Sequence, residues 1–143
     1  MTNLRRPLLR FMACAAFTLA SACGSDETVG GEDHTPVSYT VLVNGVESSS
    51  VLTLTEGQLV RVQFKFFNAA DEDLDDVESS HFGGMAFAPT SLGTIVRVAD
   101  HNFQFDVTGG TPGTGTAEVS YGHDEAADET TLSPLTVTVL AAP

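Results

Sequence analysis

From Pro36 onward, apolar and polar residues alternate along the chain, and short groups of turn-forming residues interrupt the alternation. A period of two is typical of β-strands that face a core on one side and solvent on the other. No segment carries a sustained helical stripe, in which apolar residues recur every three or four positions. The predicted strands are residues 38–43, 51–54, 59–67, 81–87, 94–99, 102–107, 116–122 and 135–140.

Turn-forming sequences separate these predicted strands. They are NG at 44–45, EGQ at 56–58, APTSLG at 88–93 and GGTPGTG at 109–115. Gly, Pro and Asn favour the tight backbone conformations that reverse a chain. Seven or eight short strands in about 105 residues therefore predict an all-β sandwich or barrel.

Three segments resemble parts of bacterial immunoglobulin-like domains. They are TLTEGQLVRVQFKFF, the later GTGTAEVSYG and the final LTVTVL. The resemblance extends over residues 36–141 and implies an immunoglobulin-like antiparallel β-sandwich of 7–8 strands, in which strands 59–67 and 116–122 face each other near the centre. Domains of this family serve as spacers, adhesion modules and ligand binders, so the resemblance does not fix a function.

The first 22 residues have the pattern of an export signal that is removed from the mature protein. Arg5, Arg6 and Arg10 precede the apolar run FMACAAFTLA and the small residues ASA. The sequence LASAC resembles the lipobox of bacterial lipoproteins, although Ala20 stands where that family prefers Leu. The resemblance implies lipidation at Cys23 and a location in the cell envelope, at the outer membrane, in the periplasm or at the cell surface. Cleavage of an ordinary secretory signal is the alternative.

The mature chain would have about 121 residues, a length that suits one domain at 36–143 behind a polar, acidic tether at 23–35. Cys14 leaves with the signal and Cys23 carries the lipid, so no thiolate chemistry is expected. Arg61, Lys65 and Arg97 remain against all 19 acidic residues, which gives a net charge of −16. This charge repels nucleic acid and attracts cations or basic partners.

Three histidines are expected at one pole of the sandwich. In the implied topology, His81, His101 and His123 lie on connections that emerge at the same end, and each is in phase with inward-facing apolar residues. Imidazole nitrogens suit zinc or copper, and carboxylates can complete the coordination. The candidate carboxylates are Glu78, Asp100, Asp124 and Glu125. His34, in the tether, is expected to be a solvated residue outside this site.

Two other interpretations remain open. The acidic loop at residues 71–78 offers oxygen ligands for calcium, although it lacks the spacing of an EF-hand. The domain is otherwise a structural or adhesive module of the envelope that binds no metal. Catalysis has little support, because the sequence has no nucleophile elbow and no phosphate-binding loop before a helix.

Cys23→Ser tests the anchor. Since the predicted lipid is on Cys23 and the tether has no apolar face, the variant should move from the membrane fraction to the soluble fraction of cell lysates. Immunoblots of separated fractions would measure this. Full retention of the variant in the membrane would contradict the lipoprotein interpretation.

Overall fold

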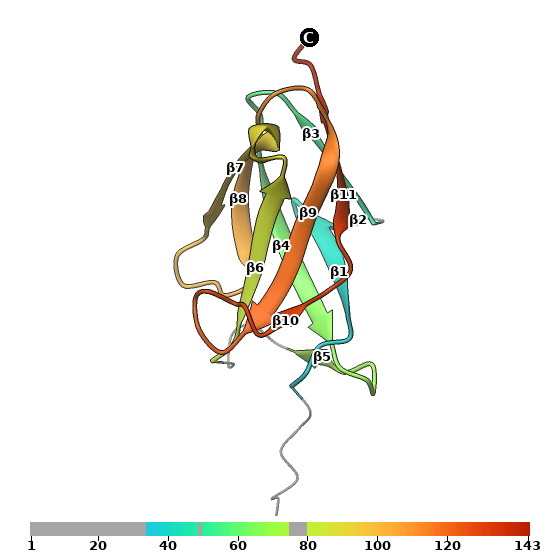
Figure 1. Ribbon diagram of the computed structural model, residues 1–143, viewed down its shortest axis with the longest axis vertical. Coiled ribbons are helices and arrows are strands. Elements are labelled where there is room, and N and C mark those ends of the chain that lie inside the picture. Colours follow the sequence, from blue (N-terminus) through green and yellow to red (C-terminus); the bar gives the residue numbers. More distant parts are fainter. Residues whose placement is uncertain (1–33, 49, 75–79) are drawn as a thin grey trace, which may run out of the picture. The chain divides into compact units, whose positions relative to one another are not determined.

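The computed structural model describes residues 34–48, 50–74 and 80–143, which form a sandwich of two β-sheets (Figure 1). Within these residues the one helical element is a short 3₁₀ turn, η1 (Thr90–Leu92). The strands are β1 (Ser38–Val43), β2 (Val46–Ser48), β3 (Val51–Thr55), β4 (Leu59–Phe67), β5 (Asp73–Leu74), β6 (Phe82–Ala88), β7 (Gly93–Arg97), β8 (Gln104–Gly109), β9 (Gly113–Gly122), β10 (Thr130–Thr131) and β11 (Leu135–Leu140).

The strand order is that of an immunoglobulin-like sandwich. One sheet runs β2-β1-β4-β8-β7, with β5 pairing the end of β4. In the other, β9 lies between β6 and β11, β11 also pairs with β3, and β10 pairs with the end of β9. If the short strands β2, β3, β5 and β10 are set aside, seven strands remain. The first, second, fifth and fourth of these, which are β1, β4, β8 and β7, form one sheet. The third, sixth and seventh, which are β6, β9 and β11, form the other sheet, as the family resemblance implies.

The core lies between the sheets and is built by the alternation seen in the sequence. Val60, Val62, Phe64 and Phe66 of β4 are buried, while the residues between them are exposed or half-buried. From the opposite sheet, β9 contributes its own inward residues, including Val119. Phe64 and Val119 retain 1% and 0% of their exposed surface, which confirms the predicted phase of both strands.

Several predicted strand boundaries are confirmed, and others differ for local reasons. Strands β1, β4 and β11 have the predicted bounds. Strand β8 begins at Gln104 instead of residue 102, because the preceding residues form a turn. The hairpin partner β2 was not predicted, since its three residues are too short for a visible alternation. Asn44 and Gly45 connect it to β1 with φ angles of 51° and 79°, as a tight two-residue hairpin requires.

The chain joins the sandwich at one end and leaves it at the other. The amide of Val37 donates to Phe67 O at 2.9 Å, at the last residue of β4. The amide of Glu56 donates to Leu140 O at 2.8 Å, beside the start of β4. A nine-residue strand, roughly 30 Å long at about 3.3 Å per residue, therefore separates the two ends (Figure 1). We call the end at Val37 the tether pole and the end at Leu140 the far pole.

No helix among the described residues is long and apolar enough to cross a membrane.

Phe64→Ala tests the core. The substitution removes a fully buried ring between the sheets and should lower the free energy of unfolding by about 3 to 5 kcal/mol. Denaturant unfolding followed by circular dichroism would measure the loss. The neighbouring half-buried Gln63 is the control, and Gln63→Ala should cost clearly less. Similar losses at both positions would show that this face of β4 is assigned wrongly.

Candidate functional site

Two of the predicted histidines meet at the tether pole. Strands β6 and β9 are antiparallel, and their register pairs Phe82 with Gly122. His81 immediately precedes β6 and His123 immediately follows β9, so the ladder brings these two residues opposite each other. Their Nε2 atoms lie 2.8 Å apart, and their ring centroids lie 4.1 Å apart. The pairing of two strands therefore creates a contact between two imidazoles.

Glu129 holds the other side of His123. His123 Nδ1 lies 2.5 Å from Glu129 Oε2, and this hydrogen bond lowers the pKa of the Glu129 carboxyl. A turn leads to Glu129, in which Asp124 Oδ1 accepts the amide of Ala126 at 2.9 Å. Because a proton on Nδ1 faces the carboxylate, the neutral His123 ring presents the lone pair of its Nε2 atom toward His81.

His81 is the buried member of the pair. It is 6% exposed and stacks on Tyr121, with a centroid distance of 5.1 Å and an interplanar angle of 17°. Burial lowers the pKa of His81, the charges of His123 and His34 lower it further, and Glu129 opposes them. Burial and Glu129 together raise the pKa of Tyr121 to about 12. Within the described residues, the buried Tyr121 hydroxyl has no hydrogen-bond partner.

His34 belongs to the same cluster, contrary to the expectation of a bystander in the tether. Its ring centroid lies 5.2 Å from that of His81, although the residue itself is exposed. Buried Pro36 and the hydrogen bond from Val37 to Phe67 hold this segment against the end of β4. One signal in the sequence was available, since His34 lies four residues before a strand that starts at the tether pole.

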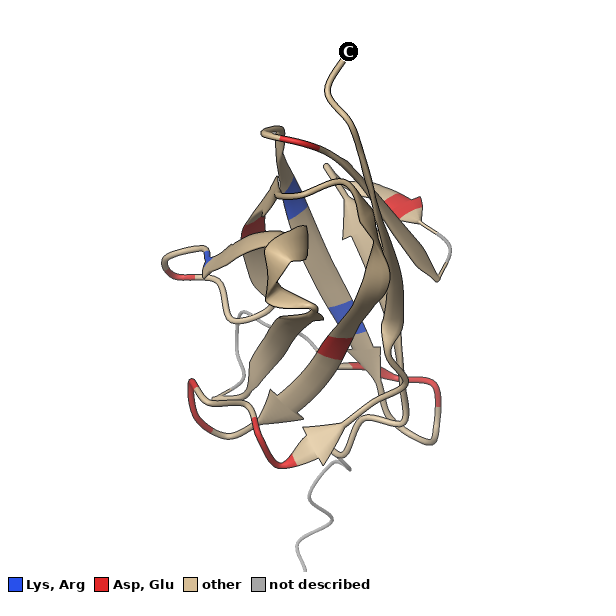
Figure 2. Cartoon of the chain, turned by 45° about the horizontal axis from the view of Figure 1, so that its top comes forward, with Lys and Arg blue, Asp and Glu red and all other residues tan. Residues whose placement is uncertain are grey.

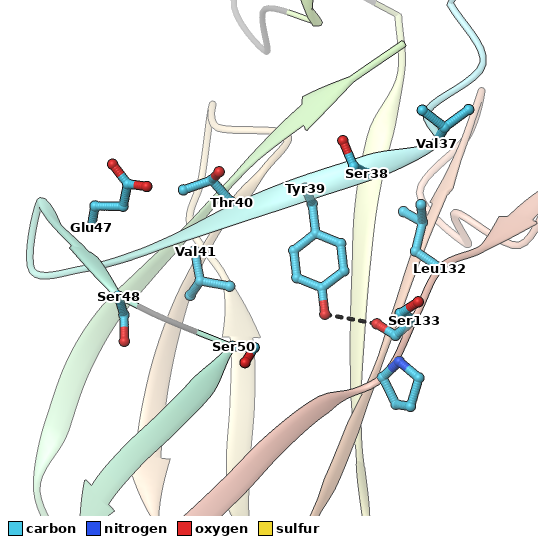
Figure 3. A pocket seen from close by; sticks show the side chains of 11 residues that line it. Val37, Ser38, Tyr39, Thr40, Val41, Glu47, Ser48, Ser50, Leu132 and Ser133 are labelled. Carbon is cyan, nitrogen blue, oxygen red and sulfur yellow. Dashed lines mark hydrogen bonds between the residues drawn. The ribbon is translucent and has the colours of Figure 1, made fainter. Parts of the chain in front are cut away.

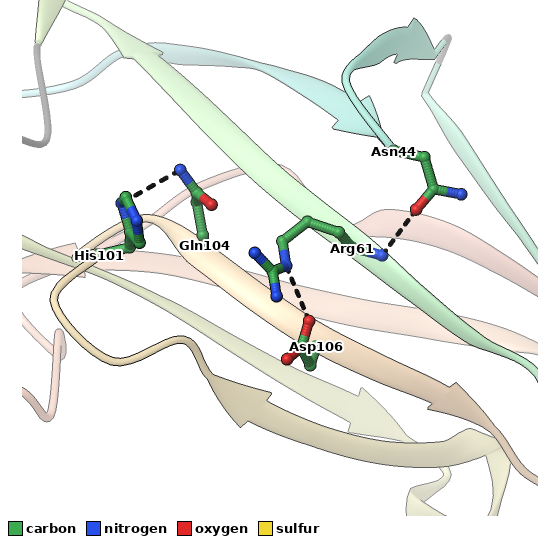
Figure 4. A network of polar contacts seen from close by, with 5 residues as sticks. All are labelled: Asn44, Arg61, His101, Gln104 and Asp106. Carbon is green, nitrogen blue, oxygen red and sulfur yellow. Dashed lines mark hydrogen bonds and ion pairs between the residues drawn. The ribbon is translucent and has the colours of Figure 1, made fainter.

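His101 lies at the same pole, but its ring has different surroundings. The side-chain amide of Gln104 donates to His101 Nδ1 at 3.3 Å (Figure 4). Gln104 belongs to the outward-facing set of β8, together with Asp106, which pairs with Arg61 at 2.8 Å. The expectation that His101 points inward with Phe103 is therefore wrong. Residues 102 and 103 form a turn between His101 and β8, and this turn interrupts the alternation.

Three of the four predicted carboxylate ligands lie in the described residues, and none of these three forms a metal site with the histidine pair. Glu78 lies outside the described residues, and the Asp124 side chain is engaged in its own turn. Asp100 and Glu125 line a shallow hollow beside His101. In the described parts of the chain, no group of three or more His, Cys, Asp or Glu side chains forms a complete metal site.

The acidic loop, proposed for calcium, is partly used in internal contacts. Glu72 Oε2 accepts the side-chain amide of Asn68 at 2.8 Å, and Asp73 pairs with Lys65 at 3.1 Å. The loop residues from 75 to 79 lie outside the described residues. These contacts are typical of a loop that caps the end of β4 with its own hydrogen bonds.

Negative charge gathers at the tether pole. Figure 2 shows acidic residues on the loops at this end. The segments that follow the ends of β4 and β9 contain Asp71, Glu72, Asp124, Glu125, Asp128 and Glu129. The three basic side chains of the domain are already engaged, two of them at this pole, where Lys65 pairs with Asp73 and Arg97 donates to Glu125 O at 3.0 Å. Arg61 and Lys65 form ion pairs, and Arg97 lies over the rings of Phe82 and Phe105 and donates to Gly83 O at 2.7 Å. The potential at this pole is therefore strongly negative.

A separate pocket opens at an edge of the sandwich, between β1 and the segment before β11 (Figure 3). Tyr39 crosses it, and its hydroxyl donates to Ser133 O at 2.7 Å. Besides Tyr39, the lining has five small hydroxyl side chains, four apolar side chains and a single carboxylate, Glu47. The hydrogen bond from Tyr39 to Ser133 joins the two sheets at this edge.

Comparisons with known proteins find a structural similarity but no sequence match for this chain. No family model matches it, and no curated protein matches it in sequence. Among solved structures, it is similar to domains 4 and 5 of the S-layer protein SbsC, with a TM-score of 0.49 and 15% sequence identity. The alignment covers 75% of this chain and 54% of that one, so the chain spans about half the length of that structure. The immunoglobulin-like assignment depends on the strand order described above.

The lowered pKa of His81 predicts a pH dependence of stability. The unfolded state binds a proton at His81 more readily than the folded state, so stability should fall as the pH drops below the ordinary value of about 6.5. Melting temperatures measured in EDTA between pH 7.5 and pH 5 should decrease, and His81→Asn should reduce the decrease. The Glu129 effect has the same sign but belongs to lower pH. An identical pH dependence in parent and variant would contradict the assignment to His81.

Proposed function

We propose that the chain is a lipid-anchored, non-catalytic module of the bacterial cell envelope, which holds an acidic immunoglobulin-like domain outside the cytoplasm in a structural or adhesive role. The anchor in this proposal is Cys23, and residues 23–35 form the tether. The support from the sequence is the signal-like N-terminus, the lipobox resemblance and the acidic composition.

One observation carries the structural part of the proposal. The chain joins the sandwich at Val37 and its last strand ends at Leu140, at opposite poles. A domain attached through the tether pole therefore keeps its far pole and the outer faces of both sheets available to partners. This arrangement suits a module that displays a surface, because attachment does not cover that surface.

The chemistry of the histidine cluster also favours a non-catalytic role. Glu129 contacts His123 Nδ1, as the carboxylate of a catalytic triad contacts its histidine. In such a triad the second ring nitrogen faces the hydroxyl or thiol of the nucleophile. Here His123 Nε2 faces the imidazole of His81 instead. The strong negative charge favours cations or basic proteins as partners and disfavours nucleic acid.

Site-specific labelling on vesicles tests the display geometry. Single cysteines would replace exposed Gln58, in the turn at the far pole, and exposed Asp128, at the tether pole. The mature chain would be purified from bacterial membranes and placed in proteoliposomes, where a bulky maleimide should label Gln58→Cys several-fold faster than Asp128→Cys. The ratio of rates in detergent micelles serves as the reference for intrinsic thiol reactivity. An unchanged ratio on vesicles would contradict the proposed orientation, and loss of both proteins from the vesicles would contradict the anchor.

A further inference from the structure

We propose that the tether pole binds one divalent transition-metal ion, Cu²⁺ or Zn²⁺, between the Nε2 atoms of His81 and His123, with His34 as a third imidazole ligand and Glu129 as the outer carboxylate. This ligand set differs from that expected from the sequence, because His34 replaces His101. It is independent of the proposed display role.

The distance between the two nitrogens is close to that of a metal-bound pair. Metal–nitrogen bonds of about 2.0 to 2.1 Å place two ligand atoms about 2.9 Å apart at a right angle and about 3.4 Å apart in a tetrahedron. The Nε2 atoms of His81 and His123 are 2.8 Å apart. An ion bonded to both atoms would lie beside the line that joins them, so its binding requires the two rings to turn toward it and to separate by a few tenths of an ångström.

Glu129 supplies the outer support that histidine ligands usually have. Metal-binding histidines typically donate their second ring nitrogen to a carboxylate, which fixes the tautomer and makes the first nitrogen a better ligand. His123 has this arrangement, since its Nδ1 atom contacts Glu129 Oε2 and its Nε2 atom faces His81.

Tyr121 gives a second, independent indication. Its ring stacks on His81, it is 2% exposed, and its hydroxyl has no hydrogen-bond partner among the described residues. Glu129 is near enough to raise the pKa of this hydroxyl. A buried polar atom without a partner is costly, and a water bound to the ion would supply one.

His34 completes the set from the segment that leads into β1. Its ring centroid is 5.2 Å from that of His81, and the residue is exposed, so a change of rotamer can turn a nitrogen toward the pair. Three imidazoles with open positions suit copper and zinc, while calcium prefers an all-oxygen shell. The surrounding acidic loops attract cations to this pole. A bound ion would fasten the tether segment to the ends of β6 and β9.

Metal titrations of histidine variants test the ligand set. The full chain with Cys14→Ser and Cys23→Ser would serve as the parent, so that no thiol competes for the ion. Cu²⁺ or Zn²⁺ should raise its melting temperature in a concentration-dependent manner, and Ca²⁺ should not. Electron paramagnetic resonance of the Cu²⁺ form should show nitrogen couplings from imidazole.

The variants separate this ligand set from its alternative. His123→Ala, at a position where the side chain is 63% exposed, should abolish the thermal shift without preventing folding. His34→Ala should weaken binding, and Glu129→Gln should weaken it by about 10- to 100-fold, as is usual for an outer-shell carboxylate. His101→Ala is the matched control at the same pole and should bind as the parent does. Binding by His123→Ala equal to that of the parent, or loss of binding in His101→Ala with no effect in His34→Ala, would overturn the proposal.

Discussion

The antiparallel ladder between β6 and β9 is the constraint on which most of this molecule depends. Its seven residue pairs run from Phe82 with Gly122 to Ala88 with Thr116. Along this ladder, Phe87 and Val119 face the core, while one step beyond it His81 meets His123. An added Cβ at Gly84 would lie 2.2 Å from Ser120 Oγ, so a larger residue there would require the Ser120 side chain to move. A single register thus determines both the packing of the sandwich and the imidazole contact.

The sequence predicted what depends on local alternation and missed what depends on turns. The bounds of β1, β4 and β11 follow from period-two patterns, and His81 and His123 kept their predicted phase because each lies one residue from a paired strand position. The predicted inward orientation of His101 is wrong, because a turn separates this residue from β8. His34 was missed because its contact with His81 joins segments distant in sequence, and the one local signal was its position four residues before a strand that starts at the tether pole.

The domain has only three basic side chains, and their positions determine how its charge is distributed. Arg61 and Lys65 form ion pairs within one sheet, and Arg97 of that sheet lies over Phe82 of the other sheet and over Phe105. At the tether pole, Lys65 pairs with Asp73 and Arg97 contacts the backbone of Glu125, but acidic side chains outnumber these two, so repulsion among them favours a bound cation or a basic neighbour. The exposed ion pairs themselves contribute little to stability.

The pairing of β3 with β11 has a mechanical consequence. These strands run parallel, with five residue pairs from Val51 with Thr136 to Thr55 with Leu140. A pulling force between the tether and the end of β11 would act along this ladder and load its hydrogen bonds in shear. The bonds would then share the load instead of opening one at a time, as the strands of a hairpin do when pulled apart at one end. Extension between these two points therefore requires several of these hydrogen bonds to break together.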